Sequence, residues 1–221
     1  MNYLISVIRK DPCNKIIVMY KFSYYTEQDQ QKVIDFMKEN AFALITGMGE
    51  NYPVATQIPL AIKIKEDKIF LEGHMMKKTD HHLAFKKNNN VLVLFTGPHC
   101  FVNANWYTDP HMGSTWNYMT VHAKGKITFM DEAGTRNAVK ALSDKYAGTS
   151  SQSAFDNLPK EYIDHMVKAI VGFSIEVEAF DNVFKLSQNR DEASQKNIIE
   201  QLRKRADANS AAIANEMEKR L

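Results

Sequence analysis

The sequence predicts an α+β protein built around a mostly antiparallel β-barrel with helices inserted between its strands. Six or so short β-type runs lie between residues 41 and 179, and turn signals separate most of them. Helical patterns interrupt the series at 79–88, 131–147 and 159–169. A parallel α/β sheet would need a crossover helix after nearly every strand, so an antiparallel barrel with helical additions is the better prediction.

Composition is that of a globular protein that is not strongly charged. The chain has 221 residues, 44% of them hydrophobic and 24% charged, which suits one large domain or one domain with an appended element. Lys and Arg number 28 against 26 acidic residues, so no strong field of one sign is available to attract nucleic acid. Any DNA-binding role would therefore need a local basic patch.

Neither a membrane span nor a secretion signal is expected. The longest aliphatic-aromatic run, Val91–Phe95, is far shorter than the ~20 residues that a spanning helix needs. Near the start, charged residues from Arg9 onward interrupt the apolar segment Tyr3–Ile8. Cys13 and Cys100 are too few for a disulfide framework, which suits a reducing compartment, and we expect a cytoplasmic protein.

The first helix is predicted to begin at Thr26 as its N-cap, followed by apolar Val33, Ile34 and Met37 at helical spacing. The ordered domain is therefore expected to start near Met19. We predict an N-terminal extension over 1–18, the main domain over 19–190 and a C-terminal helix over 191–221, whose apolar stripe would pack on the domain or on a partner.

The strands are predicted at 41–46, 54–64, 69–75, 91–95, 115–130 and 171–179. Pro59 cannot donate a ladder hydrogen bond, so the strand over 54–64 should have an edge or a bulge there. Gly97-Pro98 is expected to form a turn, and the long segment 115–130 is either one strand or a bent pair hinged at Gly125.

Three segments carry side chains suited to a ligand. In the first, 115–124, alternation separates a polar and aromatic face from an apolar one. The first face contains Trp116, Tyr118, Thr120, His122 and Lys124. Such a face suits a flat, partly polar ligand, because rings supply contact area and polar groups orient it. A half-exposed sheet face with cross-strand aromatic pairs explains the pattern equally well.

The second segment joins a strand to a short helix. Strand 69–75 places Glu72 and His74 on one face and runs into Lys77-Lys78, and Thr79 then begins the helix. Two ammonium groups beside a helix N-terminus suit a phosphate. Locally, a solvated lysine pair beside a helix cap is the more common arrangement.

The third segment, Lys185–Arg190, packs donor-rich side chains between a strand and a helix. Gln and Asn amides both donate and accept, as the edge of a heterocycle requires. A polar loop with a helix cap is the alternative, and the local pattern slightly favours it.

Known catalytic and metal motifs are missing from the sequence. The seven histidines form no HExxH or His-x-His pair, so we predict no metal site. The nucleophile elbow, the phosphate-binding P-loop and the dinucleotide fingerprint are also absent, and no catalytic residue is identifiable.

Several motifs, in order along the chain, resemble the PaiB family, which is described as FMN-binding negative transcriptional regulators. They include Thr115-Trp116-Asn117-Tyr118, Ile170-Val171-Gly172-Phe173 and Lys185-Leu186-Ser187-Gln188-Asn189-Arg190. The likeness extends from about Met19 to about Leu202. It implies an FMN-binding split β-barrel, related to pyridoxamine phosphate oxidases and flavin reductases, that forms a homodimer with two FMN sites at the subunit interface.

The resemblance also implies the residues of the FMN site. Ala55, Thr56 and Gln57 would line the ring and ribityl chain, Glu72, Gly73 and His74 would continue that wall, and Lys77 and Lys78 would hold the phosphate. Trp116, Asn117, Lys185, Gln188 and Asn189 would close the pocket, some of them from the partner chain.

The expected function is therefore FMN binding, either in a flavin-dependent oxidoreductase or in a flavin-linked transcriptional regulator. Two alternatives remain: a repressor that binds DNA directly, and haem binding on a similar barrel. DNA binding has weak support, because the basic residues Lys86-Lys87, Lys124, Lys126 and Arg203-Lys204-Arg205 are scattered along the sequence.

Overall fold

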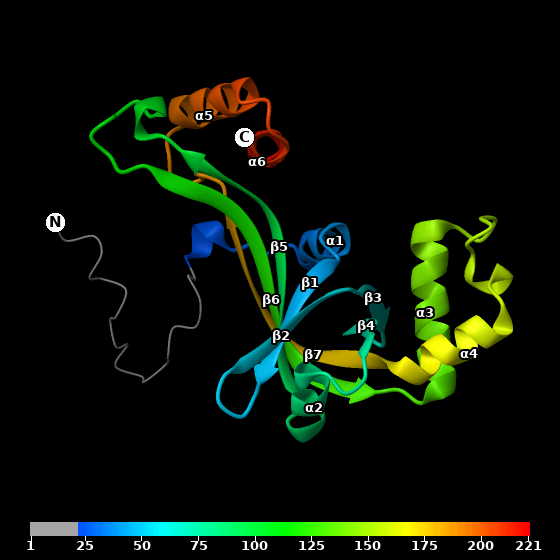
Figure 1. The fold of residues 1–221 in the computed structure, drawn as a ribbon. Coiled ribbons are helices and arrows are strands. Elements are labelled where there is room, and N and C mark those ends of the chain that lie inside the picture. The colour runs from blue at the N-terminus through cyan, green and yellow to red at the C-terminus, as the bar shows by residue number, and fades with distance from the viewer. Residues whose placement is uncertain (1–21) are drawn as a thin grey trace.

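A computed structural model describes residues 22–221, so the expected extension over 1–18 and the expected domain start at Met19 lie outside the described residues. Its centre is one curled, antiparallel sheet of seven strands in the order β2-β1-β5-β6-β7-β4-β3 (Figure 1). The strands are β1 (Phe42–Met48), β2 (Pro53–Pro59), β3 (Ala61–Lys65), β4 (Lys68–Met76), β5 (Asn90–Val102), β6 (Thr115–Phe129) and β7 (Ile170–Lys185). This confirms the α+β class with an antiparallel half-barrel.

The segment predicted as one strand over 54–64 forms two strands at opposite edges of the sheet. The break falls at Pro59 and Leu60, where β2 ends and the chain passes to β3. Proline has no N–H to continue the ladder. Leu60 is fully buried, and its N–H donates to the carbonyl oxygen of Ala41 at 2.9 Å. The interruption expected at Pro59 therefore brings the two edges of the half-barrel towards each other.

Within residues 22–221, six α-helices surround the sheet: α1 (Gln30–Glu39), α2 (Asp80–Lys87), α3 (Glu132–Ala147), α4 (Lys160–Ala169), α5 (Glu192–Lys204) and α6 (Ala208–Glu218). The N-cap of α1 is Asp29, whose carboxylate accepts from the Gln31 and Lys32 amides. The prediction of Thr26 was wrong, because its hydroxyl donates to the Phe22 carbonyl instead. The single C-terminal helix expected over 191–221 is two helices, broken near Ala206, and Asp207 caps the second.

The turn predicted at Gly97-Pro98 is wrong, since β5 continues through this point with a bulge between Thr96 and His99. Gly97 is required by packing. A Cβ atom there would come within 2.5 Å of the Phe36 ring, which projects from α1 into the core. Phe36 in turn lies 5.0 Å from the ring of Phe184 on β7. Gly97 is present because it leaves room for the Phe36 ring, and this packing requirement was mistaken for a turn signal.

The main core fills the inside of the curled sheet, where inward side chains such as Ile45, Phe95 and Phe173 meet α1. A second, smaller cluster joins α3 and α4 to the start of β7. In Figure 1, α5 and α6 lie at one end of the long β5-β6-β7 ribbon and α2 lies near the other. Among residues 22–221, no helix is long and apolar enough to cross a membrane.

Candidate functional site

The outer face of the sheet, defined here as the side opposite the main core, is lined by two rows of side chains in register. The first row is Gln57, Leu44, Leu94, His122 and Asp181, and the second is Ala55, Thr46, Leu92, Lys124 and Ala179. Three leucines and a histidine in these rows are only half-buried in the single chain. The outer face thus exposes an apolar surface at the centre of the sheet.

The strand β2 supplies the first predicted residues of the site. By register Ala55 and Gln57 belong to the outer face, whereas Thr56 pairs with the fully buried Ile45 and points to the opposite side. Because β2 is an edge strand, one side of its backbone is not paired by the sheet. Backbone N–H and C=O groups on such an edge can bond to the polar rim of a heterocycle.

On β4, the three predicted residues have different environments. The Glu72 carboxylate is paired with Lys63 at 2.5 Å, so its charge is neutralised within the chain. Gly73 faces the core, beside Phe173 and Leu60. His74 is half-buried, burial lowers its pKa, and its Nδ1 is buried with no hydrogen-bond partner in the described part of the chain. Burial therefore favours the neutral form of the His74 ring.

The two lysines after β4 have different roles in the fold. Lys77 donates its backbone N–H to Ala169 and its ammonium to the carbonyl oxygens of Val167 and Lys168, at 3.4 and 3.1 Å. It therefore satisfies the C-terminus of α4. Lys78 adopts a left-handed backbone conformation, with φ of +64°, and no ion pair or hydrogen bond engages its ammonium within residues 22–221. Of these two lysines, Lys78 is the one whose ammonium remains available for a phosphate within the described residues.

The N-terminus of α2, beside these lysines, is partly satisfied from within. The Thr79 hydroxyl accepts from the His82 amide, and His82 Nδ1 accepts from the Lys78 amide at 3.0 Å. The Asp80 carboxylate accepts from the amide of His81. Most of the anion affinity expected of this helix end must therefore come from Lys78.

The residues predicted on β6 divide between the two faces of the strand. Trp116 is 53% exposed and lies beside Phe101 and His99, with ring centroids 6.0 Å apart in both pairs. Asn117 is fully buried, accepts from the Ser187 hydroxyl at 3.0 Å and contacts Met217. Trp116 can contact a ligand, whereas Asn117 holds the fold together.

The segment Lys185–Arg190 is similarly divided. Gln188 accepts from the Leu186 amide and donates to the Phe184 carbonyl, so it closes its own loop. Lys185 donates to the Thr115 hydroxyl, and burial, with the neighbouring Arg190, lowers its pKa. Asn189 is exposed. Of the two amides predicted in this segment, Gln188 and Asn189, Asn189 is the one whose side chain faces solvent.

Within one chain, the predicted residues form two groups that lie far apart. His74 is opposite Gly172 at the start of β7, whereas Lys185 ends the same strand. At about 3.3 Å per residue, the intervening strand is roughly 40 Å long. FMN is much shorter, so it cannot contact both groups of a single chain. The structure brings Ala55, Gln57 and the β4 residues together, because β2 and β4 approach each other, but leaves Trp116 and Asn189 at the other end.

Sequence reasoning missed the three outer leucines, Leu44, Leu92 and Leu94. Each lies in a continuous apolar run. Such a run shows no alternation of apolar and polar residues, so it does not indicate which residues face outward. Sequence reasoning named Arg190 within the donor-rich segment but missed its contact, in which the guanidinium stacks on the Tyr107 ring at 4.3 Å. No sequence signal marks that contact, because it joins residues far apart in the chain.

The described part of the chain contains neither a cluster of metal ligands nor an activated Cys100 thiol. No cluster of three or more His, Cys, Asp or Glu side chains there could hold a metal ion. Burial raises the pKa of the Cys100 thiol to about 11, so it is not a nucleophile at neutral pH. The available features are an apolar sheet face, an open strand edge, a free cation and exposed aromatic rings. These fit a flat heterocycle with an anionic tail better than they fit a hydrolytic centre.

A curled antiparallel half-barrel with this set of features defines a flavin-binding split barrel. Residues 19–179 match the model of the family described as "Putative FMN-binding domain", and the chain belongs to this family. The match confirms the family resemblance and the expected cofactor, FMN.

Similar proteins agree with this assignment. Protease synthase and sporulation protein PAI 2 of Bacillus subtilis is 31% identical over 204 residues, which cover 92% of this chain and 98% of that protein. The flavocytochrome Anf3 from Azotobacter vinelandii has a TM-score of 0.58 at 14% identity and covers 73% of this chain and 69% of its own. The FAD and haem binding protein from Mycobacterium smegmatis has a TM-score of 0.56 at 13% identity, over 73% of each chain. These two structures support the fold alone.

Proposed function

We propose that two copies of this chain form a homodimer and that each FMN lies between Lys78 and the β2 edge of one protomer and the Trp116–Asn189 end of the other. The observation that carries the proposal is the separation of the two groups of residues along β7. A site that needs both groups is incomplete in one chain, and a twofold axis across the outer face would complete two equivalent sites.

The outer face supports this arrangement. Leu44, Leu92 and Leu94 form an apolar surface that water covers in a single chain, and burial of such a surface stabilises association. Near its centre, Lys124 and Asp181 pair at 3.2 Å, which reduces the cost of removing these charges from water.

The residues have separate tasks in the proposed site. Lys78 binds the phosphate, the edge of β2 bonds to the rim of the ring, and Trp116 of the other protomer excludes water from one side of it. Bound FMN would supply the electron-transfer chemistry. Half-buried His122, whose pKa burial lowers, is a neutral group near the dimer axis. No residue is assigned a proton-transfer role.

The FMN-binding protein acts either as an oxidoreductase or as a regulator that responds to the flavin. The name of PAI 2 mentions protease synthesis and sporulation, and these roles are those of PAI 2. Direct DNA binding has less support. Lys124, Lys126, Arg203 and Lys204 each pair with a carboxylate, so four of the seven basic residues named above are less available for phosphates. We place the protein in the cytoplasm, because its two cysteines are too few for a disulfide framework and Cys100 is a free thiol, as is usual in a reducing compartment.

An absorbance spectrum of the protein as purified, repeated after addition of FMN and gel filtration, tests the proposal. We expect flavin bands that co-elute with a dimer. A protein that stays colourless after exposure to FMN would overturn it, and a Soret band would favour the haem alternative.

A further inference from the structure

A second binding site is indicated at a cavity that the flavin residues do not line. It has a volume of about 210 Å³ and lies between α1 and the C-terminal end of α6, over β6 and β7. Its floor is apolar and consists of Phe36, Met119 and Phe184. Its rim carries six charged side chains, Lys32, Asp35, Glu39, Glu216, Lys219 and Arg220.

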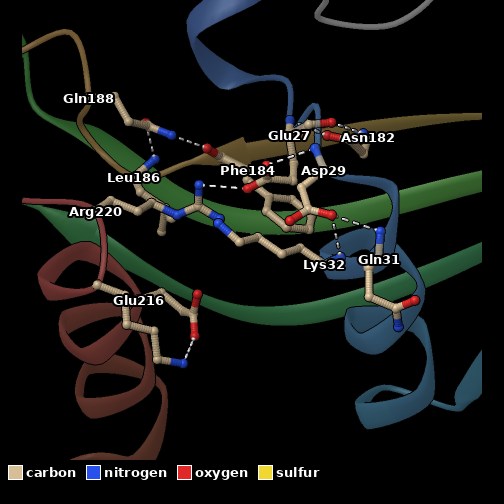
Figure 2. A network of polar contacts seen from close by, with 11 residues as sticks. Glu27, Asp29, Gln31, Lys32, Asn182, Phe184, Leu186, Gln188, Glu216 and Arg220 are labelled. Carbon is tan, nitrogen blue, oxygen red and sulfur yellow. Dashed lines mark hydrogen bonds and ion pairs between the residues drawn. The ribbon is translucent and has the colours of Figure 1, made fainter.

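One side of the cavity has cationic donors in excess. Arg220 forms an ion pair with Glu27 at 2.7 Å, and its Nε is buried with no hydrogen-bond partner among the described residues. Figure 2 shows the Lys32 side chain extending from α1 towards this guanidinium. No ion pair or hydrogen bond engages the Lys32 ammonium in the described part of the chain. The Lys32 ammonium and the Arg220 Nε therefore remain as donors for an anionic group.

The other side of the cavity offers an acceptor. Glu216 pairs with Lys219 at 2.5 Å, and Asp35 pairs with Lys38 at 3.1 Å. Glu39 has no ion pair or hydrogen bond of its side chain within residues 22–221. Its carboxylate is therefore free to accept from an ammonium group.

The charges of the rim balance, with three cations and three carboxylates, so the cavity favours a ligand that is neutral overall but has separated charges. The floor adds a preference for an apolar body, because the Phe36 and Phe184 rings pack 5.0 Å apart beneath it. The volume restricts the ligand to a small molecule, since drug-sized pockets start at about 300 Å³.

We propose that this cavity binds a free α-amino acid with an apolar side chain. The carboxylate lies against Lys32 and Arg220, the ammonium group against Glu39, and the side chain on the floor formed by Phe36, Met119 and Phe184. The proposal does not depend on the flavin site, because the two sites share no residue.

Calorimetry on the full-length protein tests the proposal with L-leucine and two analogues that each lack one charge, 4-methylpentanoate and 3-methylbutylamine. We expect L-leucine to bind at least about tenfold more tightly than either analogue, because each missing charge removes a charge-assisted hydrogen bond to the rim of the cavity. Equal binding of all three compounds, or no binding of L-leucine or L-phenylalanine at millimolar concentration, would overturn the proposal.

Variants locate the binding. Lys32→Gln and Glu39→Gln should each weaken L-leucine binding about tenfold with little change in thermal stability, because neither side chain forms an ion pair or hydrogen bond within residues 22–221. Lys87→Gln, on α2 and outside the cavity, removes a lysine with no ion pair within residues 22–221, so it is the matched control and should bind as the wild type does. If all three variants bind L-leucine equally well, the ligand lies elsewhere and the proposal fails.

Discussion

The ammonium group of Lys77 lies 3.1 Å from the carbonyl oxygen of Lys168, at the C-terminal end of α4. One of two adjacent lysines is therefore part of the scaffold, whereas its neighbour Lys78 projects without a partner in the described chain. This relationship separates stability from ligand binding at two consecutive positions, and it yields the first prediction.

Lys77→Ala should lower the melting temperature by about 2–4 °C and leave FMN binding nearly unchanged, because the last carbonyls of α4 lose a donor. Lys78→Asn should do the reverse, since asparagine tolerates the left-handed backbone but carries no charge for the phosphate. Thermal melts and FMN titrations of both variants check the prediction. If the Lys77 variant loses flavin and the Lys78 variant does not, Lys77 rather than Lys78 binds the phosphate, which contradicts the prediction.

Neighbouring residues on β6 give a second contrast. Asn117→Ala should destabilise the fold by about 2 kcal/mol, because it leaves the buried Ser187 hydroxyl without its acceptor. Trp116→Ala should leave the free energy of unfolding nearly unchanged and weaken FMN binding, because the ring is exposed. Urea unfolding and FMN titration measure the two effects. Equal effects of both substitutions on unfolding would contradict the assigned orientations.

The ion pair between Glu27 and Arg220 predicts a dependence of stability on pH. Burial opposes ionisation of Glu27, but the Asp29 amide and Arg220 outweigh it, so its pKa lies below the usual 4.5. A carboxyl group with a lowered pKa contributes stability above its unfolded pKa and loses it as the pH falls through the folded value.

Glu27→Gln should therefore be less stable than the wild type by about 1–3 kcal/mol at pH 7, and this difference should shrink below about pH 4.5. Unfolding of both proteins at pH 7 and pH 3.5 measures it. A difference that stays constant across this range would show that Glu27 acts through packing rather than charge.

The outer face predicts an effect on assembly. Leu94→Asp should convert the dimer to a monomer and abolish FMN binding, because it places a charge in the row that also contains His122 and Asp181. Ile64→Lys is the control. Ile64 is 50% exposed on β3, the edge strand farthest from β2 in the order of the sheet, so the new charge lies outside the two rows of the outer face. Light scattering after gel filtration measures the mass of each variant. A dimeric, yellow Leu94 variant would place the interface elsewhere.

Much of the fold could be predicted from the sequence, because its signals are local. The alternation in β6 and β7, the Thr79 cap of α2 and the interruption at Pro59 depend on neighbouring residues alone. The Gly97-Pro98 turn was wrong because the reason for the glycine is the Phe36 ring, more than sixty positions away. No local pattern carries that information.

The candidate site was less predictable for the same reason. Lysine, asparagine and glutamine suit a ligand equally well wherever they occur, and only long-range contacts reveal that Lys77, Asn117 and Gln188 are engaged within the chain. The separation of the two groups of residues depends on the length of β7, which extends six residues past its predicted end at 179.

Mixed dimers test whether each FMN lies between two chains. The first variant is Lys78→Asn and the second combines Trp116→Ala with Asn189→Ala, so each variant alone should bind FMN poorly. After the two are mixed under conditions that allow chains to exchange, each mixed dimer contains one intact site, and tight FMN binding should return. A mixture that binds no more FMN than the average of its two components would contradict the account.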